Sequence, residues 1–234
     1  MSNGQDIFIV GAARTAIGTF GGSLSSFRPA ELGTIVIKEA LERAGIAPAD
    51  VQNVVIGTVV PTQPKDAYVS RIAAVDAGIP VDAPAMNVNR LCGSGLQAIV
   101  SAAQAMALGE HDIAVAGGAE CMSNAPHMVL AARNGQKMGN IEMVDAMLGA
   151  LHDPSENIHM GVTAENVAER CGIGREEQDA VAVESHRRAA AAIAAGYFKE
   201  QIVPVEVQKR RETVEFKVDE HPKPTTEEAL AGLR

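Results

Sequence analysis

Short apolar runs alternate with helical patterns along the first half of the chain, and this alternation restricts the fold more than any other feature. Four runs have the length and composition of strands, at residues 7–13, 54–60, 85–88 and 113–118. Three segments between them have the period of helices, at residues 29–44, 68–77 and 96–108. Nearly continuous apolar strands joined by helices are typical of a parallel sheet buried on both faces. The sequence therefore predicts an α/β fold with a mainly parallel sheet covered by helices.

The chain changes character after Glu120. Residues 85–121 hold 4 charged residues in 37, whereas residues 205–234 hold 13 in 30, so only the first stretch is expected to be deeply buried. The second half shows two helical segments, an exposed strand and a final helix opened by a Thr-x-x-Glu capping box, at residues 161–170, 175–195, 214–218 and 225–228. We predict two parts: a core over residues 1–121, and an excursion over residues 122–234 after which nothing returns to the sheet.

Composition excludes several classes of protein. The net charge of −9, the 3% aromatic content and the absence of Trp disfavour nucleic-acid binding, which needs a basic surface and usually aromatic platforms. The apolar run near the N-terminus is too short for a signal peptide or a membrane span. The three cysteines are widely spaced and form no CxxC pair, so neither a disulfide framework nor a metal site is expected. These features predict a cytoplasmic protein that binds no membrane.

One of these cysteines occupies a position suited to chemistry. Cys92 follows the apolar run that ends at Val88 and precedes Gly93-Ser94-Gly95 and an apolar helix. A helix N-terminus offers free N–H groups and a dipole that favour a thiolate and a developing oxyanion. Cys92 is therefore a candidate nucleophile, although the local pattern also fits a small buried side chain at a tight turn.

The other two cysteines lack this setting. Cys121 follows a strand, and Cys171 lies in the last turn of a helix, where the dipole disfavours a thiolate.

Several motifs in a fixed order resemble the thiolase family. They are Asn-Arg-Leu-Cys-Gly-Ser-Gly at residues 89–95, Ala-Gly-Gly-Ala-Glu at 116–120, His-Met-Gly at 159–161, Gly-Ala-Ala-Arg-Thr-Ala-Ile-Gly at 11–18 and Val-Thr-Ala-Glu-Asn at 162–166. The stretch 148–154 looks closest to bacterial acetyl-CoA acetyltransferases and β-ketothiolases. The resemblance implies a thiolase N-terminal domain whose core over residues 1–121 lacks its last strand, followed by a long helical loop domain over residues 122–234.

The resemblance also implies a reaction. Cys92 would take the acyl group of an acyl-CoA, and a second acetyl-CoA, deprotonated at its α-carbon, would attack the acyl-enzyme to form a 3-ketoacyl-CoA. Cleavage by CoA is the reverse. The substrate would be a coenzyme A thioester, bound by Leu151, His159 and Met160. No separate cofactor would be needed. Residues 127–139 match the family's tetramer-forming loop, so the resemblance implies a homodimer or homotetramer.

The family's other catalytic motifs are absent from the sequence. Gly-His-Pro, Cys-x-Gly and Asn-Glu-Ala-Phe do not occur, and all three belong to the family's C-terminal half. We therefore expect the C-terminal thiolase domain to be absent and the isolated chain to lack full activity. The alternative is a non-catalytic thiolase-like subunit that acts through oligomer contacts or CoA binding.

Two enzymatic alternatives fit less well. A Rossmann dehydrogenase needs G-x-G-x-x-G, but Ala13 and Ala16 stand at two of its glycine positions. A ketoacyl synthase of the same superfamily is closer. The long insertion with His-Met-Gly at residues 159–161 favours a thiolase.

Overall fold

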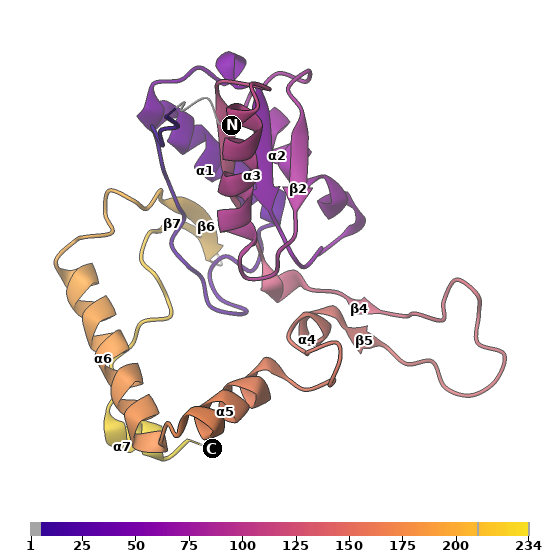
Figure 1. Cartoon of the computed structure of the whole chain (residues 1–234), viewed down its shortest axis with the longest axis vertical. Coiled ribbons are helices and arrows are strands. Elements are labelled where there is room, and N and C mark those ends of the chain that lie inside the picture. Colours follow the sequence, from indigo (N-terminus) through magenta and orange to yellow (C-terminus); the bar gives the residue numbers. More distant parts are fainter. Residues whose placement is uncertain (1–5, 210, 234) are drawn as a thin grey trace.

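A three-stranded parallel sheet forms the centre of the first half, which confirms the predicted α/β class (Figure 1). The computed structural model describes residues 6–209 and 211–233. The strands are β1 (Asn53–Gly57), β2 (Ala85–Val88) and β3 (Ala114–Gly118), in the order β2-β1-β3. In the central strand, Val55 lies opposite Met86 on one side and Ala116 on the other. All three strands therefore end at the same edge of the sheet.

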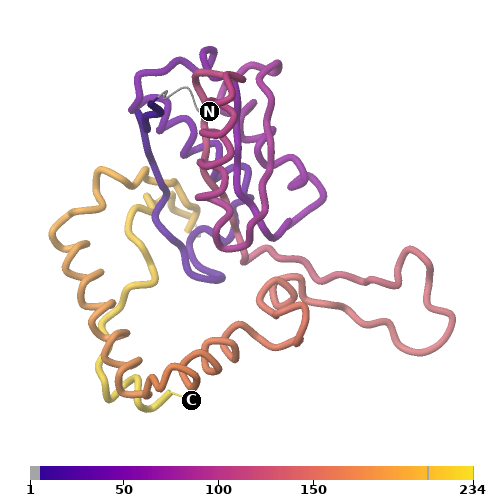
Figure 2. The backbone as a smooth tube through the Cα atoms, viewed as in Figure 1, coloured from indigo at the N-terminus to yellow at the C-terminus, as the bar shows by residue number. Residues whose placement is uncertain are grey.

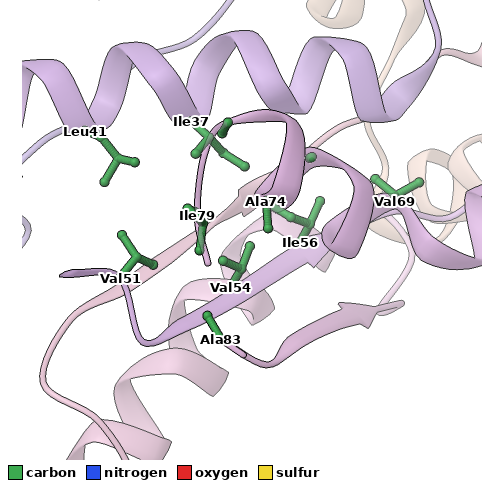
Figure 3. Packing of buried hydrophobic residues seen from close by; sticks show 11 residues of the cluster. Ile37, Leu41, Val51, Val54, Ile56, Val69, Ala74, Ile79 and Ala83 are labelled. Carbon is green, nitrogen blue, oxygen red and sulfur yellow. The ribbon is translucent and has the colours of Figure 1, made fainter. Parts of the chain in front are cut away.

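Helices cover both faces of this sheet. One face packs on α1 (Pro29–Ala44) and α2 (Val69–Asp76), and the other on α3 (Ser94–Ala107). Figure 3 shows the first layer, in which Ile37 of α1 and Ala74 of α2 lie over Val54 and Ile56 of β1. Val55 points to the opposite face, because successive strand side chains alternate. This alternation makes β1 the buried middle of the core.

The expected strand over residues 7–13 does not form. The segment is extended and largely exposed, with Phe8 74% and Ile9 77% accessible. A cavity of about 650 Å³ is lined by this segment together with β3, α1 and α3. A strand needs a neighbouring strand for its N–H and C=O groups. Since the cavity separates the segment from β3, the apolar composition alone does not make it a strand.

The second half is a chain of smaller elements. In order, they are β4 (His127–Met128), β5 (Val144–Asp145), α4 (Ala146–Ala150), α5 (Met160–Cys171), α6 (Arg175–Ala194), β6 (Val205–Lys209), β7 (Glu212–Phe216) and α7 (Glu227–Ala231). Short 3₁₀ turns at Pro48–Asp50, Pro64–Tyr68 and Met122–Asn124 connect elements of the core. The connection between β4 and β5 projects away from the core (Figure 2). Thr226, one residue later than expected, caps α7 by accepting a hydrogen bond from the Ala229 N–H.

The antiparallel β6–β7 hairpin packs against the first half. Val205, Val207 and Phe216 form a buried cluster with Ala16, Leu24 and Leu32. The strand expected at residues 214–218 was predicted to be exposed, but Phe216 is only 8% accessible. The prediction of an exposed strand is therefore wrong. Strand β6, which the sequence pattern did not reveal, pairs with this strand, and the hairpin packs Phe216 against the core. The boundary between residues 121 and 122 stays a prediction.

No described helix is both long and apolar enough to cross a membrane.

Candidate active site

Cys92 lies in the turn between β2 and α3, at the edge where the parallel strands end. The Gly93 N–H donates to the Arg90 carbonyl at 3.1 Å, and the Ser94 N–H donates to the Leu91 carbonyl at 3.0 Å. Leu91 has a φ of 48°, a left-handed conformation that is uncommon for a residue with a side chain. Cys92 is exposed, so the alternative of a small buried side chain is wrong.

Ser94 holds this turn from beneath. Its side chain is buried, donates from Oγ to the Leu91 carbonyl at 2.6 Å and accepts from the Arg90 N–H at 2.8 Å. Both hydrogen bonds close the backbone around Cys92. Ser94 therefore fixes the turn.

The start of α3 lies directly against the ends of two strands. A Cβ added to Gly57 would lie 2.5 Å from the Ser94 carbonyl carbon, closer than real Cβ atoms come to other atoms. A Cβ on Gly118 would lie 3.4 Å from the Gly95 Cα. These glycines let the helix begin on top of the sheet edge, which places Cys92 beside the strand ends.

Backbone donors are left without partners at the start of α3. Within the described part of the chain, the N–H groups of Cys92, Gly95 and Leu96 donate no hydrogen bond. N–H groups at a helix start point outward along the helix axis and carry its positive partial charge. Donors of this kind stabilise an oxyanion that forms next to a helix start.

The other cysteines differ from Cys92 in their surroundings. Cys121 is buried, and its Sγ lies 3.8 Å from the Leu24 carbonyl and 3.3 Å from Asn124 Nδ2. Cys171 is exposed but is the last residue of α5, at the end where carbonyl groups are left over. Only Cys92 therefore joins exposure with a helix N-terminus.

Glu120 braces the loop after β1. Its carboxylate accepts from the Val59 N–H at 2.7 Å and the Val60 N–H at 3.2 Å. Burial raises the pKa of the Glu120 carboxyl, while these two N–H groups act in the opposite direction. The side chain therefore has a structural role, and it supports the same edge of the sheet.

The three predicted substrate-binding residues lie together at the junction of α4 and α5. The Met160 N–H donates to the Leu151 carbonyl at 2.8 Å, and His159 caps α5 by accepting from the Gly161 N–H at 3.0 Å. His159 and Met160 are exposed, and Leu151 is half-buried. No described hydrogen bond joins this group to Cys92. Within the described residues, no group of three or more His, Cys, Asp or Glu side chains is arranged to hold a metal ion.

Comparison with known proteins decides the family. The model of the thiolase N-terminal domain matches residues 7–234. The chain belongs to the thiolase family. It is 58% identical to β-ketothiolase BktB of Cupriavidus necator over 217 residues, covering 93% of this chain and 55% of the relative. It is 47% identical to an acetyl-CoA acetyltransferase of the same organism, covering 98% of this chain and 59% of the relative.

Solved thiolase structures have the same fold. The acetyl-CoA acetyltransferase of Bacillus anthracis superposes with a TM-score of 0.92 at 44% identity, covering 97% of this chain and 57% of that chain. Human mitochondrial 3-ketoacyl-CoA thiolase superposes with a TM-score of 0.94 at 38% identity, covering 97% and 58%. This thiolase chain thus spans somewhat more than half the length of these relatives.

Several residues that shape this thiolase site were missed from the sequence. Gly57 ends an apolar strand with no turn signal around it, and its role depends on where α3 crosses the sheet. Ser94 was not singled out, because the sequence does not show which backbone groups its Oγ would bond. His152 has an edge-on contact with His159 that only the folded loop reveals. A serine within a Gly-Ser-Gly turn was the one available signal.

Proposed function

We propose that this thiolase chain carries the acyl-accepting cysteine of C-acyl transfer between coenzyme A thioesters. The observation that supports it most is the exposed thiol of Cys92 just before the N-terminus of α3, where three backbone N–H groups donate no described hydrogen bond. The names of the relatives, a β-ketothiolase and an acetyl-CoA acetyltransferase, support the same chemistry.

The first step is transfer of the acyl group to sulfur. The Cys92 thiolate attacks the thioester carbonyl carbon, a new C–S bond forms, and the displaced electron pair moves onto the carbonyl oxygen. The N–H groups at the α3 start stabilise that oxyanion. When the carbonyl re-forms, the bond to the CoA sulfur breaks, and CoA leaves as a thiolate that takes up a proton.

The second step forms the carbon–carbon bond. Acetyl-CoA loses an α-proton to a base, its carbanion attacks the acyl-Cys92 carbonyl, and the C–S bond to Cys92 breaks. The products are a 3-ketoacyl-CoA and the free thiolate, and thiolysis is the reverse. Because Gly-His-Pro and Cys-x-Gly motifs do not occur here, we propose that this chain alone stops after acylation. A missing general base typically costs about 10²–10⁴-fold in rate.

The remaining roles follow the same proposal. Leu151, His159 and Met160 form a wall for the acyl and pantetheine groups of CoA, because they share one junction and two of them are exposed. The coenzyme A of the substrate is the only non-protein group that this reaction needs. Assembly as a homodimer or homotetramer, and residence in the cytoplasm, belong to the same proposal.

Incubation of the chain with acetyl-CoA tests the proposed steps separately. We expect intact mass to show one acetyl group per chain, and we expect no steady formation of acetoacetyl-CoA. Adding a second chain that carries the Gly-His-Pro and Cys-x-Gly motifs should restore condensation. Sustained acetoacetyl-CoA production by this chain alone would contradict the proposal that it stops after acylation. Absence of any adduct, with condensation still missing after complementation, would favour the non-catalytic alternative.

A further inference from the structure

A closed loop joins the last turn of α4 to the first turn of α5. The Met160 N–H donates to the Leu151 carbonyl and the Asp153 N–H to the Ile158 carbonyl, each at 2.8 Å. Between these two bonds, His152 and His159 face each other as antiparallel partners. Cross-strand partners flanked in this way hold their side chains on the same face and close together. The loop therefore fixes the positions of both histidines.

The tip of the loop is also closed by hydrogen bonds. The Asp153 carboxylate accepts from the Ser155 and Glu156 N–H groups at 2.9 and 2.7 Å. The Asn157 N–H donates to the Asp153 carbonyl at 2.9 Å. Since local bonds satisfy the tip, the histidine pair at its base is not needed to close the loop.

The two imidazole rings make an edge-to-face contact. Their centroids lie 5.4 Å apart and their planes are at 88°, the arrangement that aromatic rings favour. His152 is half-buried and His159 is exposed. The inner ring thus supports the outer one.

The hydrogen bonds of the rings fix opposite tautomers. His152 Nδ1 lies 2.6 Å from the Leu148 carbonyl, which can only accept, so Nδ1 carries the proton. His159 Nδ1 accepts from the Gly161 N–H at 3.0 Å, so the proton of the neutral ring is on Nε2. Within the described residues, that Nε2–H has no acceptor. His159 therefore presents one hydrogen-bond donor to a ligand.

We propose that His152 is a positioning residue for CoA binding, an inference that rests on the proposed function. Its ring holds the His159 imidazole so that Nδ1 stays on the Gly161 N–H and Nε2–H is turned outward. The acceptor for this donor is an amide carbonyl of the pantetheine arm. His152 itself does not contact the substrate in this arrangement.

Three variants separate the ring contact from the hydrogen bond to Leu148. His152→Phe keeps an aromatic ring and loses the Nδ1–H donor, His152→Asn keeps a donor and loses the ring, and His152→Ala loses both. His127→Ala, at an exposed histidine of β4, is the control. The readouts are the His159 tautomer, from two-bond ¹H–¹⁵N correlation spectra without ligand, and the affinity for CoA by titration calorimetry.

We expect a single Nε2–H tautomer at His159 in the unaltered chain, in His152→Phe and in His127→Ala. The CoA affinity of these two variants should be close to that of the unaltered chain. His152→Asn and His152→Ala should show mixed tautomers and CoA affinity about 2- to 10-fold weaker, the range of one aromatic pair. An unchanged tautomer and affinity in His152→Ala would overturn the proposal. If the unaltered chain binds no CoA, the proposed function fails, while the His159 tautomer still decides the positioning role.

Discussion

Gly57 decides at the residue scale where α3 can begin. The alanine variant, Gly57→Ala, would place a Cβ 2.5 Å from backbone of Ser94, and backbone in a buried junction cannot turn away as a side chain can. We expect Gly57→Ala to lower the free energy of unfolding by about 1–3 kcal/mol, the usual cost of overpacking. It should also slow alkylation of Cys92 by iodoacetamide, because the turn shifts. Urea denaturation and mass-resolved alkylation kinetics measure the two effects.

Gly117→Ala is the matched control for this variant. Gly117 is in the neighbouring strand β3, and a Cβ there would meet no atom within 4 Å. We expect both its stability and its Cys92 alkylation to stay near those of the unaltered chain. Equal losses in the two variants would show that close approach at Gly57 is not what positions the turn.

At the scale of elements, two carboxylates attach the segment after β7 to the chain before α1. Asp219 pairs with Arg14 at 2.8 Å and accepts from the Ile17 N–H, while Glu220 accepts from Thr19 and Ser23. The Arg14 hydrogen bond lowers the pKa of Asp219, and the Ser23 hydrogen bond lowers the pKa of Glu220. A pKa lowered on folding gives stability that is present above the unfolded pKa.

This linkage predicts how stability changes with pH. The contribution should be complete above the ordinary values of 3.8 for Asp219 and 4.5 for Glu220, and lost as the pH falls through the lower folded values. The double variant Asp219→Asn with Glu220→Gln should be less stable at pH 7 and lose less stability between pH 6 and pH 3. Urea unfolding across this pH range measures both changes.

Glu215→Gln is the control for the carboxylate pair. Glu215 is on β7, close in sequence, and its carboxylate forms an exposed ion pair with Lys217. Exposed ion pairs contribute little, so its pH profile should match the unaltered chain. A double variant whose pH profile also matches would contradict the role of Asp219 and Glu220.

The elements also show what the sequence could predict. The helix over residues 29–44 was predicted with its observed bounds, because a period of apolar residues and Gly45 at the C-terminal stop are local signals. The segment 7–13 was predicted to be a strand and is not one, since pairing depends on a distant neighbour. At the site, Cys92 was predictable from its order between strand and helix. Gly57 depends on a contact across the fold and His152 on a contact within a folded loop, and both were missed.

At the scale of the whole molecule, the β4–β5 connection leaves apolar side chains in solvent. Leu130 is 73% accessible, Met138 86% and Ile141 58%, on a segment that projects from the core (Figure 2). Large exposed apolar side chains grouped on one segment are typical of an interaction surface. We predict that Met138→Asp with Ile141→Asp lowers the oligomeric mass measured by light scattering.

Val181→Asp is the control for that prediction. Val181 is 70% accessible on α6, and its substitution introduces one negative charge, against two in the double variant, away from the projecting segment. Its oligomeric mass should equal that of the unaltered chain. The prediction would be contradicted if the unaltered chain were a monomer. It would also be contradicted if the double variant had the same oligomeric mass as the unaltered chain.

One measurement tests whether Cys92, and neither of the other cysteines, accepts the acyl group. The unaltered chain and the variants Cys92→Ser, Cys121→Ser and Cys171→Ser are incubated with acetyl-CoA, quenched in acid and weighed by intact mass spectrometry. We predict one thioester-bound acetyl group on the unaltered chain and on the Cys121 and Cys171 variants, released by hydroxylamine, and none on Cys92→Ser. An acetyl adduct of equal amount on Cys92→Ser would contradict the account.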